Sequence, residues 1–138
     1  MTVLLDTCIV IDLLQDRAPH ANVARTLFRA IASEQVKACI TSKSVTDIYY
    51  LVHKSTHSDK ETRGTLNKLL TLVSMIDTTA DDVFLALSSP VTDFEDAVLI
   101  ESAVRSHVDY IITRNLKDFT KSQIPVLSPS QLLKKLEP

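Results

Sequence analysis

The sequence has little glycine, little cysteine and no excess of basic residues, and each shortage excludes a class of protein. Its 138 residues contain one glycine, Gly64, no repeat and no Pro/Gly/Ser-rich linker, so nothing marks a domain boundary. The two cysteines, Cys8 and Cys39, each lie in an apolar run, which favours buried thiols in a reducing cytosol over a disulfide framework. With 45% hydrophobic residues, positions 1–138 are predicted to form a single domain around one sizeable core.

Two further absences concern membranes and nucleic acid. Asp6 and Asp12 interrupt the first apolar stretch, and no basic leader precedes it, so we expect no signal peptide, no membrane contact and a cytoplasmic location. The formal net charge is −2, whereas proteins that grip nucleic acid mainly through its phosphates usually have a basic excess. A local basic rim around an acidic centre is still compatible with this charge.

Short apolar runs alternate along the chain with longer helical patterns. Strands are predicted at residues 2–6, 37–41, 74–79, 109–113 and 125–128. Helices are predicted at residues 8–15, 21–33, 42–54 and 93–104, with further helices opened by Ser58 and Glu61, by Thr79 and Asp82, and by Ser128, Pro129 and Gln131. Strands separated by helices imply parallel crossovers, so we expect an α/β fold, a three-layer sandwich with a central parallel sheet flanked by helices.

Polar residues stand where several of these strands end. They are Asp6, Thr41, Ser42, Thr113, Arg114 and Asn115. In an open parallel sheet, functional groups gather beyond the carboxyl ends of the strands. We therefore expect these residues to converge on one edge of the sheet.

Three acids, Asp93, Glu95 and Asp96, stand at the start of the helical pattern in DFEDAVLIESAVR. At about 100° per residue, Asp93 and Asp96 share the apolar stripe of this helix, so both are predicted to point toward the protein. Glu95 falls outside the stripe and follows Thr92 at the spacing of a capping box. The helix macrodipole favours acids here, but it does not explain two inward-facing carboxylates, whose desolvation costs several kcal/mol.

Gathered at one edge, Asp6, Asp93 and Asp96 would repel one another, by about 4 kcal/mol for a pair at ~4 Å and an effective dielectric of 20. No Lys or Arg stands in residues 2–6 or 93–104, so a bound cation is expected among the acids. Oxygen ligands favour Mg²⁺ or Mn²⁺ over zinc. Such a cation would activate water for in-line attack on a phosphodiester without a side-chain nucleophile.

The segments LLDTCIVIDLL, ITSKSVTDIYYLV, DFEDAVLIESA and YIITRNLKDF, in this combination and order, resemble a PIN-domain ribonuclease of the kind found as the toxin in bacterial type II toxin–antitoxin pairs. The resemblance covers nearly the whole chain. It implies a PIN-like fold, an acidic quartet that binds Mg²⁺ or Mn²⁺, and cleavage of single-stranded RNA. It also implies a cognate antitoxin and a homodimer as partners.

The resemblance assigns roles to individual acids. It matches Asp6 to the acid that ends the first strand and Asp96 to the acid that opens the long late helix, with Asp93 as a supporting metal ligand.

The sequence departs from the family pattern at two positions. Asn115 stands where many relatives have aspartate, which weakens the case for a second metal, although Asp118 supplies a nearby acid as a further ligand. Asp47 stands where relatives often have glutamate, and its helical position flanks the apolar stripe. Asp6, Asp47, Asp96 and Asn115 are therefore the predicted catalytic residues.

Other side chains near the predicted site are candidates to contact RNA. These are Thr7, Ser42, Lys43, Thr113, Arg114 and Lys117. The aromatic residues Tyr49, Tyr50, Phe94 and Phe119 are instead expected in the core.

Two functions from other classes stay open. A Mg²⁺-dependent phosphotransfer domain also carries aspartates at strand ends, but the phosphatase D-x-D pattern is absent because Asp6 is followed by Thr7 and Cys8. A catalytically degenerate PIN-like module that binds RNA or protein would explain the departures at Asp47 and Asn115. Metal-dependent RNA cleavage separates these alternatives from a ribonuclease.

Overall fold

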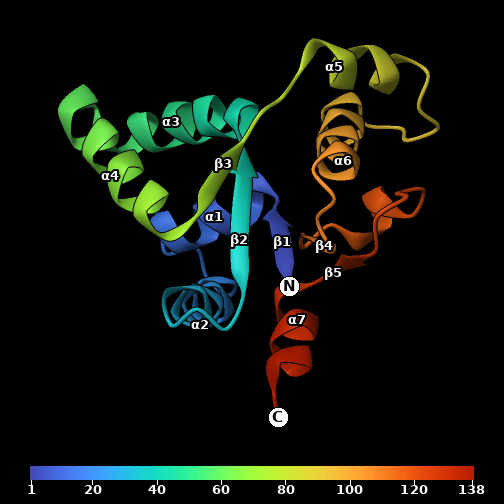
Figure 1. Cartoon of the computed structure of the whole chain (residues 1–138). Helices are drawn as coiled ribbons and strands as arrows, with labels where there is room; N and C mark the ends of the chain where they lie inside the picture. The colour runs from blue at the N-terminus through green and yellow to red at the C-terminus, as the bar shows by residue number, and fades with distance from the viewer.

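The computed structural model describes residues 1–138 and contains one five-stranded sheet with helices on both faces (Figure 1). The strands are β1 (Thr2–Leu5), β2 (Lys37–Thr41), β3 (Ser74–Ile76), β4 (Tyr110–Ile112) and β5 (Val126–Leu127). The helices are α1 (Thr7–Leu14), α2 (Ala21–Ala32), α3 (Ser42–Thr56), α4 (Asp59–Leu72), α5 (Ala80–Leu87), α6 (Phe94–Arg105) and α7 (Pro129–Leu136), with a short 3-10 helix, η1 (Leu116–Phe119).

All strand pairs are parallel, in the order β3-β2-β1-β4-β5, which confirms the predicted α/β sandwich. β1 is central, and Leu5 at its end pairs with Ile112 of β4. The strand predicted at residues 74–79 ends at Ile76, because Thr79 caps α5 instead. The carboxyl ends of β1, β2 and β4 therefore meet at one edge, as expected.

Side chains that alternate along the central strand enter two separate apolar cores. Val3 and Leu5 pack with α1–α4 and α7, which cover one face of the sheet. Leu4 packs with α5, α6 and Phe119 on the other face. In Figure 1, α1–α4 lie to the left of the sheet and α5 and α6 to the upper right. Because both faces are buried, β1 reads as a continuous apolar run.

The helix starts test the predicted caps. The helix starts predicted at Ser58, Thr79 and Ser128 are confirmed. Thr79 with Asp82 and Ser128 with Gln131 form full capping boxes, whereas of the box predicted for Ser58 and Glu61 only the hydrogen bond from the Glu61 N–H to the Ser58 hydroxyl, at 3.1 Å, is present. The predicted box between Thr92 and Glu95 is wrong, because α6 has Asp93 as its N-cap residue, with a carboxylate that accepts the Asp96 N–H at 3.0 Å. Aspartate is a stronger N-cap than threonine, which explains a helix start one residue later than expected.

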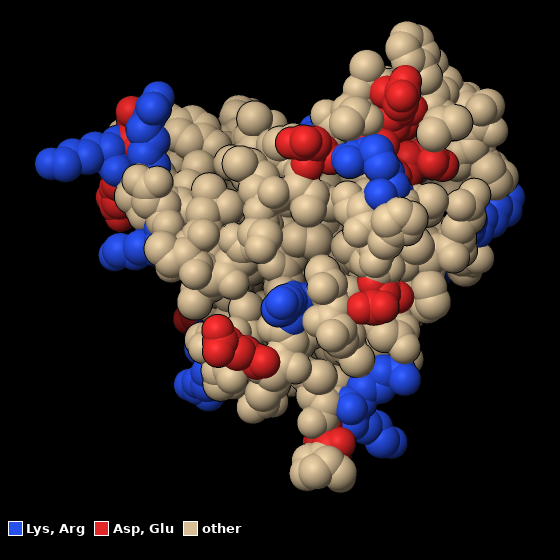
Figure 2. All heavy atoms as spheres, in the orientation of Figure 1, with Lys and Arg blue, Asp and Glu red and all other residues tan.

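The surface carries charge of both signs. On the face shown in Figure 2, Lys and Arg side chains are scattered between acids and form no continuous basic field, in line with the net charge of −2. None of the helices has the length and apolar character needed to cross a membrane.

Candidate functional site

A cavity of about 280 Å³ opens between α3 and α6, beyond the ends of β1 and β2. Four carboxylates line it, from the residue after β1, from α3 and from the first turn of α6: Asp6, Asp47, Glu95 and Asp96. Thr7 and Lys43 are also part of its wall. The structure thus brings three of the predicted catalytic residues, Asp6, Asp47 and Asp96, to one place.

Asp6 is fixed by two side chains at the ends of neighbouring elements. The Thr113 hydroxyl donates to Asp6 Oδ2 at 2.8 Å, and the Cys8 thiol donates to the same oxygen at 3.5 Å. Burial, with the neighbouring Asp6 charge, raises the pKa of Cys8 to about 11, so the thiol keeps its proton. Thr113 also accepts the N–H of Asn115 at 3.1 Å. The Thr113 hydroxyl therefore positions Asp6.

Asp6 and Asp96 are the two acids whose ionisation the site opposes. Burial raises the pKa of Asp6, and hydrogen bonds from Thr113 and Cys8 offset only part of this rise. Burial raises the pKa of Asp96 to about 7, and the charges of Asp93, Asp6, Asp118 and Glu95 add to it. Neither Asp6 nor Asp96 forms an ion pair within the protein. A bound cation would favour the ionised form of both carboxylates, because its charge offsets the cost of their burial and their mutual repulsion.

Asp93 and Asp118 lie beside the main cavity rather than in it. Both are exposed, and both line a neighbouring cavity that also includes Lys117. The prediction that Asp93 points into the protein is wrong, because it precedes the helix as its cap and helical periodicity does not apply to it. Their charges still reach Asp96 and raise its pKa.

Two of the predicted site residues, Asn115 and Ser42, do not line the cavity. The side chain of Asn115 is exposed and forms no hydrogen bond, and the residue precedes η1 without lining the cavity. The Ser42 hydroxyl accepts the N–H of Thr78 at 3.0 Å and ties the chain after β3 to α3. The backbone N–H of Asn115 and the carboxylate of Asp6 share the Thr113 hydroxyl, so Asn115 lies beside the cavity without lining it.

Lys43 and Glu95 form a bridge across the cavity that the sequence did not predict. Lys43 Nζ lies 2.6 Å from Asp47 Oδ2 on its own helix and 3.5 Å from Glu95 Oε2 on α6. No basic residue was expected among the acids, because residues 2–6 and 93–104 contain none. Lys43, which lies close to them, comes from α3 instead. Glu95 is a cavity residue rather than a capping partner, and only the packing of α3 beside α6 reveals this.

Arg114 is engaged by a buried acid. Its guanidinium donates to Asp12 at 2.6 and 3.2 Å, and Arg17 lies 3.0 Å from the same carboxylate, which is almost fully buried. This ion pair joins the end of β4 to α1. Arg114 therefore has a structural role beside the RNA contact predicted for it.

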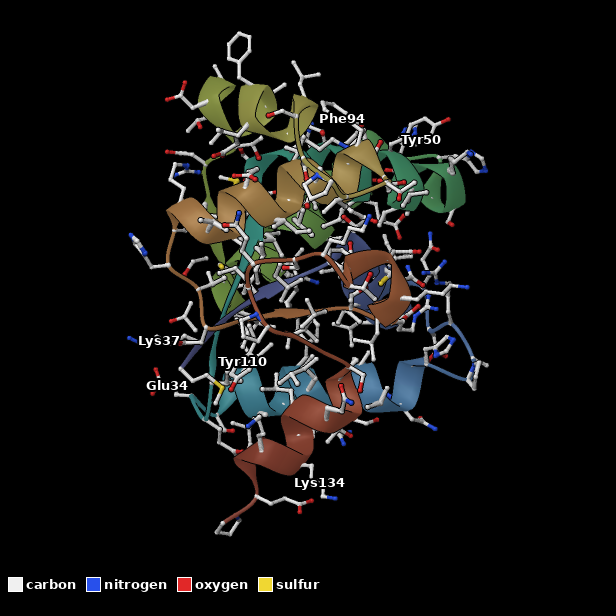
Figure 3. The ribbon with its side chains drawn as sticks, turned by 90° about the vertical axis from the view of Figure 1, so that its right-hand side faces the viewer. Glu34, Lys37, Tyr50, Phe94, Tyr110 and Lys134 are labelled. Atoms are coloured by element: carbon white, nitrogen blue, oxygen red, sulfur yellow. The ribbon has the colours of Figure 1, made fainter.

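The aromatic residues divide into two groups. Phe119 is buried, as predicted. Tyr49 is only half-buried and belongs to neither apolar core, contrary to the prediction, and its hydroxyl donates to Asp59 at 2.5 Å. Tyr50 and Phe94 are exposed by 61% and 46%, so the prediction that they belong to the core is wrong. In Figure 3, their labelled side chains lie on α3 and at the start of α6.

The donor chemistry of the cavity fits a hard divalent cation. Carboxylate oxygens are the ligands that Mg²⁺ and Mn²⁺ prefer, and Asp6 and Asp96 are free of basic partners. In the present side-chain arrangement, no three Asp, Glu, His or Cys groups lie close enough together to hold an ion. Asp6 and Asp96 would therefore hold the cation with water or substrate oxygens, as Mg²⁺ sites commonly do.

The PIN-domain family model matches residues 2–117. No curated protein sequence matches the chain. A toxin–antitoxin complex from Klebsiella pneumoniae is 24% identical, covers 92% of this chain and 97% of its own, and gives a TM-score of 0.67. VapBC2 from Rickettsia felis, bound to a promoter DNA fragment, is 18% identical with a TM-score of 0.66 and coverages of 93% and 98%. The sarcin-ricin loop cleaving toxin VapC20 of Mycobacterium tuberculosis is 14% identical, with a TM-score of 0.65 and coverages of 89% and 98%.

Proposed function

Because the chain belongs to the PIN-domain family, we propose that it is a metal-dependent endoribonuclease that hydrolyses phosphodiester bonds of single-stranded RNA. The observation that carries this proposal is the pair Asp6 and Asp96, two unpaired carboxylates with raised pKa values in one cavity at the carboxyl edge of the sheet. The two fully buried acids of the chain, Asp12 and Asp82, have arginine partners. Carboxylates kept unpaired at a cost in stability are typical of functional sites.

The residues of the cavity have distinct proposed roles. Asp6 and Asp96 would hold Mg²⁺ or Mn²⁺, with Asp93 and Asp118 as outer acids that strengthen the attraction for a cation. A bound divalent cation supplies activation of water and neutralisation of charge on the phosphoryl oxygens. Asp47 accepts from Lys43 in the resting site, and exchange of this ammonium onto a substrate phosphate would free the Asp47 carboxylate.

The polar neighbours of the acids would position the substrate. Thr7 lines the cavity and Lys117 the neighbouring one, so both lie within the surface that RNA would cover. Thr113 acts through Asp6, and Asn115 would reach the substrate only from outside the cavity. The roles of these residues toward RNA stay predictions.

We further propose that the chain is the toxin of a toxin–antitoxin pair in the cytoplasm, with a cognate antitoxin and a second copy of itself as partners. Support comes from the similar solved structures, which include toxin–antitoxin complexes and a sarcin-ricin loop cleaving toxin. Phe84 and Leu87 of α5, exposed by 69% and 68%, give a protein partner an apolar surface to cover. Light scattering on the purified protein tests the homodimer.

A second function is favoured by one observation. Asp47 is already paired with Lys43 and no three acids enclose a metal position, which is also the arrangement expected of a binding module that has lost catalysis. The two functions differ in whether RNA is cut or only held.

A mixed RNA pool, incubated with the protein in Mg²⁺, in Mn²⁺ and in EDTA, tests the proposal. We expect internal cleavage with either ion and none in EDTA. Cleavage that persists unchanged in EDTA contradicts metal dependence, and RNA that is bound but never cut supports the binding module. Transfer of phosphate from acetyl phosphate to the protein would instead identify a phosphotransfer domain.

A further inference from the structure

One exposed aromatic side chain lines the acidic cavity, and a second stands next to two of its lining acids in the chain. Tyr50 of α3 lines it on the side of Asp47, and Phe94 immediately precedes Glu95 and Asp96 on the α6 side. Neither ring belongs to the two apolar cores. In Figure 3, Tyr50 and Phe94 are seen on the two helices that form the cavity walls. Exposed rings at the rim of a polar cavity are positioned to contact whatever enters it.

The charge around this cavity gives RNA phosphates little to bind. Asp6 and Asp96 repel a phosphate until a cation is bound, and the ammonium of Lys43 must give up its contacts with two carboxylates before it can bind a phosphate. The whole chain has a net charge of −2. Phosphate neutralisation therefore supplies little affinity, and another source is needed. Stacking of bases on aromatic rings is such a source, because it does not depend on charge.

Tyr50 carries a further feature suited to a nucleotide. Lys54, one turn later on α3, places its Nζ 5.0 Å from the centre of the Tyr50 ring. This cation–π contact restrains the ring, and it adds a positive charge outside the acidic centre. A nucleotide stacked on Tyr50 has a phosphate on each side, and the one that points away from the acids would lie near this ammonium.

We propose that Tyr50 and Phe94 stack on unpaired bases on the two sides of the scissile phosphate. The inference rests on the proposed ribonuclease function and deepens it by naming the residues that select single-stranded substrate. Bases in a duplex have their faces covered by neighbouring pairs, so paired RNA cannot use these rings. Every base offers an aromatic face, so the two rings select unpaired structure rather than a base sequence.

The absence of tryptophan from the chain makes the proposal directly measurable. Tyr50→Trp and Phe94→Trp each create a protein with one fluorescent indole at the cavity rim. Phe84→Trp, at an exposed aromatic position on α5, is the matched control. Each is combined with Asp96→Asn so that RNA stays intact, and is titrated with a single-stranded octamer, an abasic octamer of the same charge and a short RNA duplex.

We expect the single-stranded octamer to quench the indole at positions 50 and 94 but not at position 84, and the abasic octamer and the duplex to leave all three unchanged. Equal quenching by the abasic octamer would overturn the proposal, because phosphates alone would then bring RNA to the rings. Quenching that grows with protein concentration in the absence of RNA would also overturn it, since a second copy of the chain would then cover them.

Kinetics supply a second measurement that does not require the tryptophan variants. Tyr50→Leu and Phe94→Leu keep apolar bulk but lose the aromatic face, so KM for single-stranded RNA should rise roughly 5-fold to 100-fold with little change in kcat. Tyr50→Phe should restore the wild-type KM. Leucine variants that cleave with wild-type KM contradict the stacking role while the ribonuclease function stands. Quenching by the octamer without any cleavage by the wild-type protein supports stacking and contradicts the ribonuclease function.

Discussion

Two carboxylates six residues apart, Asp6 before α1 and Asp12 inside it, have opposite electrostatic surroundings. Asp12 is exposed by only 1%, and Arg17 and Arg114 neutralise it. Asp6, immediately before the helix, receives hydrogen bonds from Thr113 and Cys8 but no ion pair, and burial raises its pKa. Asp12 therefore stabilises the contact between α1 and the end of β4, whereas Asp6 lines a cavity without an ion-pair partner.

The same contrast separates Asp82 from Asp96 on the opposite face of the sheet. Burial raises the pKa of Asp82, but hydrogen bonds from Arg105, the Thr79 N–H and Ser102 outweigh it, so the pKa lies below its ordinary value. The pKa of Asp96 is raised to about 7, first by burial and then by the charges of its acidic neighbours, and no basic partner lowers it. Position at a helix start does not distinguish the two residues. The partners that tertiary structure brings to each carboxylate do.

The largest expected effect comes from the unpaired acids. Asp96→Asn should lower RNA cleavage by at least about 100-fold, the order seen when one preorganised electrostatic group is lost. The metal-free fold should be equally stable or more stable, because a like-charge repulsion is removed. RNA cleavage in Mg²⁺ and denaturant melts in EDTA measure the two effects.

Glu95→Gln is the matched control for that experiment. The side chain of Glu95 is 75% exposed, and its contact with Lys43 is an exposed ion pair, worth about 0–1 kcal/mol. Cleavage should therefore stay within a few-fold of wild type. If Glu95→Gln and Asp96→Asn lost activity equally, the division between them would be wrong.

Removing a basic partner of the buried Asp12 should lower the free energy of unfolding. Arg114→Met leaves the buried Asp12 with Arg17 as its one partner, and breaking such a pair costs about 3 kcal/mol. Arg17→Met should cost less, about 1 kcal/mol, because the Arg17 side chain is 42% exposed against 26% for Arg114. Chemical denaturation of both variants measures the difference, and equal losses would contradict the central role given to the Asp12–Arg114 pair.

The smallest expected effect is a pH dependence of the metal-free protein. The pKa of Asp96 is raised from 3.8 to about 7, so between these values the folded state binds more protons than the unfolded state. Stability in EDTA should therefore rise as the pH falls from about 7 to about 5, by at most ~1 kcal/mol given the partial exposure of Asp96. The lowered pKa of Asp82 acts in the opposite direction, and its contribution is lost only as the pH falls below about 4.

Melts at several pH values, compared between wild type and Asp96→Asn, separate these contributions. The variant should show a flatter profile between about pH 5 and 7. A wild-type stability that instead increased from pH 5 to pH 7 would contradict the raised pKa of Asp96 in the folded state.

Patterns that depend on neighbours in the sequence were predicted correctly. The parallel sheet follows from apolar runs separated by helices, and Asp6 follows from its position after the first strand. Asp93 and Glu95 were misplaced because Thr92 and Asp93 are both good N-cap residues, and a shift of one residue changes which acid lies inside the helix.

Features that depend on packing between distant elements were not predicted. The bridge from Lys43 to Glu95 depends on how far apart α3 and α6 lie in the folded chain. The Asp12–Arg114 pair joins residues 102 positions apart in the sequence. The exposure of Tyr50, which lines the cavity, and of Phe94, the first residue of α6, likewise depends on how the helices pack, which sequence periodicity does not describe. Periodicity shows which face of a helix is apolar, but not what lies opposite it.

The hydrogen bond from Thr113 to Asp6 joins residues 107 positions apart, and it connects the first strand that a ribosome makes to one of the last. A growing chain has Asp6 from the start, but β4 and Thr113 are added only after most of the protein has been translated. A polypeptide released early by a premature stop codon, or still lacking residue 113 on the ribosome, therefore has no completed acid site. Truncated translation products of this gene should be harmless to RNA even where they accumulate.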